Sequence, residues 1–114
     1  MPPLQQSAHL FNRAVASAIR LPAIGDLLGR AFTIVQYTGR KSGRDIELVT
    51  NYRHEGERII IGVGMPEKNT WWRNFTGEGA PITLELAGYR RFGHAVADKD
   101  SKGRRIVRVV LQPQ

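Results

Sequence analysis

The chain has 114 residues, no cysteine and a formal net charge of +7. This length predicts one domain over residues 1–114, and the lack of cysteine excludes disulfides, thiolate catalysis and cysteine metal sites. The positive charge indicates an anionic partner, which the composition leaves open as nucleic acid, a membrane surface or a phosphorylated small molecule.

Residues 1–30 are predicted to form an N-terminal helical segment. Apolar residues recur on one helical face from Leu10 to Ile19, with Ser7 as an N-cap and Pro22 after the last turn. The simplest interpretation is a helix packed on a sheet, and a basic helix on a membrane surface is the alternative. No targeting segment is recognised, and no run approaches the roughly 18 apolar residues of a membrane span. We therefore expect a cytoplasmic protein, with peripheral membrane contact as the alternative.

From residue 31 to residue 114 the pattern is that of strands, with β-branched and aromatic residues and period-two alternation. A short helix near Asn69 to Phe75 interrupts them. About six antiparallel strands at this spacing predict a mainly β (α+β) domain, a barrel or a sandwich. The predicted strands cover residues 32–38, 46–52, 58–63, 81–87, 91–96 and 106–111, and the turns between them include 54–57, 88–89 and 99–103.

The turn Thr38-Gly39-Arg40-Lys41-Ser42-Gly43-Arg44 between the first two strands is the most informative segment. Its two glycines allow tight backbone geometry, and exposed N–H groups in such a turn can form an anion-binding nest. Arg40, Lys41 and Arg44 add positive charge and Ser42 adds a hydroxyl donor, which suits a phosphate group. A solvated hairpin with incidental basic residues is an equally good interpretation of the spacing. The glycine spacing differs from that of a Walker loop.

The second informative segment, residues 65–75, carries Trp71 and Trp72 side by side in the sequence. Asn69 is expected to cap the short helix that follows it. Adjacent positions do not share a helix face, so one indole should pack inward and the other elsewhere. The simplest interpretation is that each tryptophan packs in the core or in a subunit contact. The functional alternative is that one indole lies beside the flat ring system of a ligand. Lys68 is a candidate partner for a ligand phosphate or carboxylate.

The three histidines show no metal-binding spacing. His54 is expected to be solvated in a turn, and His94 to be a hydrogen-bonded sheet residue. The sequence indicates no metal site, no Ser–His–Asp triad and no glycosidase pair of carboxylates. No catalytic residue is assigned.

The turn at residues 38–43, Lys68 and the run Trp71-Trp72-Arg73-Asn74-Phe75 together resemble the deazaflavin-dependent nitroreductase family. Members of this family are actinobacterial oxidoreductases with a split β-barrel, related to the FMN-binding pyridoxamine-phosphate-oxidase-like proteins. The family pattern is a T-G-R-K-S/T-G turn, two strands, a lysine-containing loop and a W-Y-x-N-L helix. The resemblance covers residues 30–98 and implies a split β-barrel of about six antiparallel strands with an N-terminal helix and a short inserted helix.

The resemblance implies an oxidoreductase that uses the reduced deazaflavin F-420 to transfer a hydride to a quinone, enone or nitro compound. Arg40, Lys41 and Ser42 would hold the phosphate and acidic tail of the cofactor, Lys68 would lie along it, and Asn74 would support the loop. In such an enzyme the cofactor carries the hydride, and the protein supplies binding, orientation and electrostatics. The implied cofactor-binding residues are Gly39, Arg40, Lys41, Ser42, Gly43, Arg44, Lys68, Trp71, Trp72 and Asn74.

Two departures from the family pattern keep alternatives open. The interval from Lys68 to Asn74 is one residue shorter than in the family, and only residues 99–103 separate the last two strands, where relatives have a helix. An FMN-binding reductase of the same barrel, a non-catalytic ligand carrier and a homodimer that completes the pocket are therefore alternatives. A nucleic-acid-binding barrel fits less well, because the basic turn has no interleaved aromatic residues.

Overall fold

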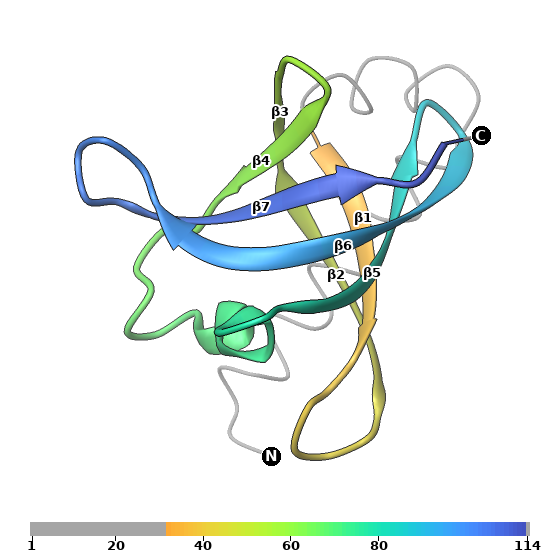
Figure 1. The fold of residues 1–114 in the computed structure, drawn as a ribbon. Helices are drawn as coiled ribbons and strands as arrows, with labels where there is room; N and C mark the ends of the chain where they lie inside the picture. Colours follow the sequence, from red (N-terminus) through yellow and green to blue (C-terminus); the bar gives the residue numbers. More distant parts are fainter. Residues whose placement is uncertain (1–31, 114) are drawn as a thin grey trace.

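The structure is a computed structural model that describes residues 32–113, and these form one seven-stranded antiparallel sheet (Figure 1). The predicted N-terminal helix over residues 1–30 lies outside the described residues. Within residues 32–113, no helix is long and apolar enough to cross a membrane. The elements are β1 (Phe32–Thr38), β2 (Asp45–Asn51), β3 (Arg53–Glu55), β4 (Arg58–Gly62), the 3-10 helix η1 (Thr70–Phe75), β5 (Ala80–Leu86), β6 (Tyr89–Lys99) and β7 (Arg105–Leu111).

The sheet curls into a half-barrel, which confirms the predicted mainly β, split-barrel type of fold. The inserted helix is also where the sequence predicted it. The structure adds β3, which occupies part of the expected turn at residues 54–57. Arg53 pairs with Ile60 and Glu55 with Arg58, so only two residues remain for the turn. Gly56 can start so tight a turn because it adopts a φ of 64°.

The order of strands in the sheet is β2-β1-β5-β6-β7-β4-β3, so β2 and β3 are its two edges. These edges are consecutive in sequence and only Tyr52 separates them. The chain therefore passes from one edge of the sheet directly to the other, which requires the sheet to curl. Figure 1 shows the result, with β6 and β7 crossing in front of β1 and β2.

The hydrophobic core lies inside the curl and follows the period of two that strands impose. Phe75 brings η1 into this core, since its side chain is 0% exposed. Burying a phenylalanine side chain contributes about 1.5–3 kcal/mol, which fixes the short helix against the sheet. The core residues are Val35, Tyr37, Ile59, Ile61, Val63, Phe75, Ile82, Leu84, Ala95, Val107 and Val109.

Candidate functional site

The loop between β1 and β2, residues 39–44, is a fixed turn, and we call it the basic loop. The N–H of Gly39 donates to the Arg44 carbonyl at 2.8 Å, and the N–H of Gly43 donates to the Gly39 carbonyl at 2.9 Å. The Ser42 hydroxyl accepts the Arg44 N–H at 3.2 Å. A Cβ at position 39 would lie 2.6 Å from the Ser42 Oγ, so a larger residue there would require the Ser42 hydroxyl to move from its place at the Arg44 N–H.

Asn74 and Arg40 attach the basic loop to η1. The Asn74 Oδ1 accepts the backbone N–H of Arg40 at 2.8 Å, and its Nδ2 donates to the Trp71 carbonyl at 2.8 Å. The Arg40 guanidinium donates to the hydroxyl and carbonyl of Thr76 at 3.0 and 2.9 Å, and to the Arg73 carbonyl at 3.5 Å. Asn74 thus supports the loop, as the resemblance implied. The Arg40 side chain satisfies carbonyls at the end of η1, which leaves it less available to a ligand.

A hollow of about 280 Å³, the loop hollow, lies between the basic loop and η1. Its described lining contains cationic side chains and no carboxylate. Among residues 32–113, no acceptor is found for the backbone N–H groups of Lys41 and Ser42, so both donors are available to a ligand or to water. Lys41 is exposed at the rim. The lining residues are Gly39, Arg40, Lys41, Ser42, Ile46, Thr70, Arg73 and Asn74.

The two tryptophans face different surroundings, as predicted. The Trp71 ring packs towards the core, with its centroid 6.4 Å from that of Tyr37. Trp72 donates its indole N–H to the Pro66 carbonyl at 2.9 Å, and the Arg105 guanidinium carbon lies 4.1 Å from the Trp72 ring centroid. Both indoles are half-buried, and neither lines the loop hollow.

Trp71 instead lines a second hollow of about 410 Å³, which we call the apolar hollow. The two hollows follow each other along one face of β2, because Ile46 lines the first and Leu48 and Thr50 line the second. At the start of η1, Thr70 lines the loop hollow and the next residue, Trp71, lines the apolar hollow. The lining of the apolar hollow is Phe32, Leu48, Val49, Thr50, Asn51, Gly62, Val63, Gly64, Asn69 and Trp71.

Two of the implied cofactor-binding residues, Lys68 and Arg44, lie outside both hollows. Lys68 lies outside both hollows, and its backbone N–H donates to the Met65 carbonyl at 2.9 Å. The exposed side chain of Arg44 is also outside the loop hollow. Asn69 occupies the N-cap position of η1, as predicted, but its side chain makes no capping hydrogen bond, because its amide donates to the Gly64 carbonyl at 2.6 Å.

Ile46, Thr70 and Arg73 line the loop hollow and were not singled out from the sequence. Arg73 belongs to the tryptophan motif, and its position next to Asn74 could have predicted that it lies near the basic loop. Ile46 could be placed only once the face of β2 was known. Of the histidines, His94 has its Nε2 2.6 Å from the Glu78 carbonyl, as expected of a hydrogen-bonded sheet residue.

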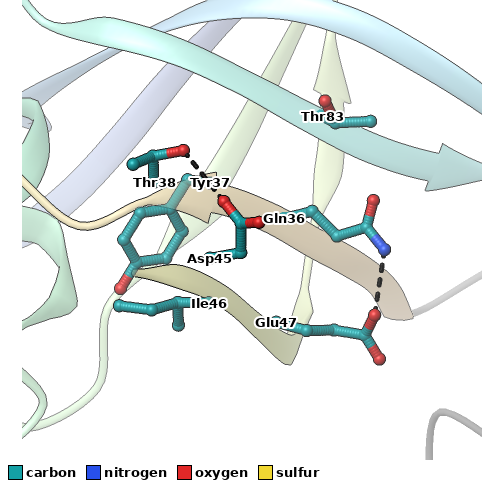
Figure 2. Close-up of a pocket in the computed structure, with 7 residues that line it drawn as sticks. All are labelled: Gln36, Tyr37, Thr38, Asp45, Ile46, Glu47 and Thr83. Carbon is teal, nitrogen blue, oxygen red and sulfur yellow. Dashed lines mark hydrogen bonds between the residues drawn. The ribbon is translucent and has the colours of Figure 1, made fainter. Parts of the chain in front are cut away.

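A third hollow, of about 500 Å³, lies over β1 and β2 and has a different chemistry (Figure 2). Gln36 donates to the Glu47 carboxylate at 2.9 Å, and Thr38 donates to the Asp45 carboxylate at 3.2 Å. These are directly opposed cross-strand pairs. Two carboxylates in the lining make this hollow unsuited to a phosphate. Tyr37 also lines it, and burial raises the pKa of that phenol.

No protein-family model matches the chain, and no curated protein is significantly similar to it. The family resemblance is therefore carried by the motif residues alone. The structure brings the two motifs together. Arg40 and Asn74 are 34 positions apart in the sequence, and the Arg40 backbone N–H lies 2.8 Å from the Asn74 Oδ1.

Proposed function

We propose that the chain is an oxidoreductase that uses reduced F-420 for hydride transfer to a quinone, enone or nitro-type acceptor. One observation carries the proposal. The loop hollow combines the cations Lys41 and Arg73 with the free backbone donors of Lys41 and Ser42, and no carboxylate is in its described lining. Charge-assisted donors and a backbone nest are the groups that bind a phosphate well.

The two hollows suit different parts of such a cofactor. F-420 joins a phosphate and an acidic tail to a flat ring system. Lys41, Ser42 and Arg73 would hold the phosphate in the loop hollow, which is too small for the ring as well. The adjacent apolar hollow, with Trp71 in its wall, falls within the range of about 300–1,000 Å³ of small-molecule pockets and would take the ring. Arg40 would act on the loop rather than on the ligand.

When bound, the cofactor supplies the hydride, and the residues of this chain bind and orient it. Asn74 links the phosphate-binding loop to η1, and Phe75 fixes η1 in the core. The two hollows therefore share one rigid support, which favours a constant distance between phosphate and ring.

The test is a titration of the protein with F-420 and, separately, with FMN, followed by tryptophan fluorescence. We expect saturable binding of F-420 and affinity at least 10-fold lower in Lys41→Ala/Arg73→Ala, because each charge-assisted hydrogen bond contributes about 1.5–3 kcal/mol. Arg53→Ala/Lys102→Ala removes the same charge outside both hollows and is the matched control. No binding of F-420, or equal losses in the two double variants, would refute the proposal.

Two alternative functions would use the same two hollows. An FMN-binding reductase would show FMN displacing F-420 in competition. A non-catalytic carrier is favoured by the short connection between β6 and β7, which is a turn over residues 100–104. A carrier would bind F-420 and transfer no hydride to any acceptor, whereas turnover with menadione or a nitro compound would exclude it.

A further inference from the structure

A second group of basic side chains gathers around Trp72, and we call Trp72, Arg73, Lys99 and Arg105 the Trp72 cluster. They line a hollow of about 250 Å³ where the turn between β6 and β7 meets η1. Arg73 lines both this hollow and the loop hollow. The other lining residues are Pro66, Glu67 and Gly103.

Arg105 is held in one orientation. Its guanidinium carbon lies 4.1 Å from the Trp72 ring centroid, within the distance of a cation–π contact. One of its N–H groups donates to the Asp98 carbonyl at 3.3 Å, and the indole itself is fixed by its bond to the Pro66 carbonyl at 2.9 Å. A guanidinium held by these two contacts keeps its remaining donors ordered, which lowers the entropy lost when it binds an anion.

The carboxylates near the cluster are paired with other residues. Asp98 forms an ion pair with Arg108, and Asp100 forms one with Arg104 at 2.8 Å. Within residues 32–113, no ion pair is formed by the three cations of the cluster, and Glu67 is the one carboxylate in the described lining. A packing role explains the stacking of one arginine on an indole. Arg73 and Lys99, both exposed, add two further positive charges to the same hollow, against the single carboxylate of Glu67.

We propose that the Trp72 cluster is a second anion-binding site, which takes one phosphate or carboxylate group. Arg105 supplies an ordered, planar fork, and Lys99 and Arg73 supply point charge and additional donors. The site depends only on residues of β6, β7 and η1, so it does not require that the loop hollow binds F-420. Because Arg73 lines both hollows, an anion in one lowers the repulsion felt by the cations of the other.

The experiment is an NMR titration of the full chain with inorganic phosphate and, separately, with glutarate, at constant ionic strength. The indole N–H signal of Trp72, assigned with Trp72→Phe, reports the site. We expect a saturable shift with at least one of the two anions, and affinity at least 10-fold weaker in Arg105→Gln and in Lys99→Gln. Saturation by one anion alone assigns the site to phosphate or to carboxylate chemistry.

Lys102→Gln is the matched control, because it removes one charge from the same turn, lies outside the hollow and breaks none of the described ion pairs, so it should leave the titration unchanged. Lys41→Gln should also leave the Trp72 response in place while it weakens binding at the basic loop, which separates this site from the proposed cofactor site. The exposed Lys99 makes Lys99→Gln informative even if Arg105→Gln unfolds. A shift that does not saturate, or that is equal in Lys99→Gln and Lys102→Gln, would overturn the proposal.

Discussion

Replacing Asn74 by alanine should detach the basic loop from η1 and leave the sheet intact. The substitution removes two hydrogen bonds of 2.8 Å, one from the Arg40 N–H and one to the Trp71 carbonyl. A typical hydrogen bond contributes about 0.5–1.5 kcal/mol net. Water can reach the exposed Arg40 N–H, so the loss should be in the lower half of the summed range. We expect the free energy of unfolding to fall by about 1–2 kcal/mol.

Urea unfolding measures this loss as a midpoint lower by about 0.5–1 M, and hydrogen exchange of the Arg40 amide reports the loop itself. Asn74→Asp is an informative companion, because it keeps the acceptor for the Arg40 N–H but places a carboxylate at the loop hollow. It should restore protection of the Arg40 amide and still weaken the proposed binding of phosphate. If Asn74→Ala leaves both the midpoint and the Arg40 exchange rate unchanged, the argument that Asn74 holds the loop is wrong.

Three further predictions concern the scaffold and are measured by urea unfolding. Phe75→Ala should cost about 3–5 kcal/mol, since it empties a fully buried position, and a loss below 1 kcal/mol would contradict the packing of η1. Gly79→Ala should cost about 2–5 kcal/mol, because φ is 80° and a Cβ would lie 2.1 Å from a backbone carbonyl of β6. The control Gly77→Ala, with φ 69° and open space around the Cβ, should cost only about 1–2 kcal/mol, and equal losses would contradict the role of the contact. Hydrogen bonds, chiefly from backbone N–H groups, lower the pKa values of Asp98 and Asp100 below 3.8. As the pH falls, the unfolded chain therefore takes up protons first. The contribution of the two carboxylates to stability should be complete above about pH 5 and lost as the pH falls through their folded-state pKa values. In Asp98→Asn/Asp100→Asn the free energy of unfolding should depend less on acid pH, and an unchanged dependence would refute this role of the two carboxylates.

The strands were predictable from the sequence because each has a local pattern. Period-two alternation marked the strand that contains Leu84, and a run of β-branched residues marked the strand that contains Ile60. The sheet order was not predictable, since the pairing of β1 with β5 and of β4 with β7 depends on contacts that no local pattern encodes. The short β3 was missed because three exposed residues beside a turn carry no alternation signal.

The candidate site was predictable as a pair of motifs but not as a set of side-chain roles. The basic loop and η1 do meet, and Asn74 connects them. The sequence could not show that Arg40 turns towards the carbonyls of η1, nor that Arg73 lines the hollow in its place. The contact of Arg105 with Trp72 could not be predicted, because the two residues lie in different parts of the chain.

The single residue between the two edge strands also has a consequence for how the chain assembles. β1–β2 and β3–β4 are local hairpins joined at Tyr52, and β5, β6 and β7 form a local meander that inserts between them. Pairing between such distant segments is slow, in about milliseconds to seconds for all-β proteins. A cut between β4 and η1 would put the basic loop in one fragment and Asn74 in the other. Complementation of the two fragments could therefore be scored by the return of the proposed phosphate binding, since neither fragment holds both walls of the loop hollow.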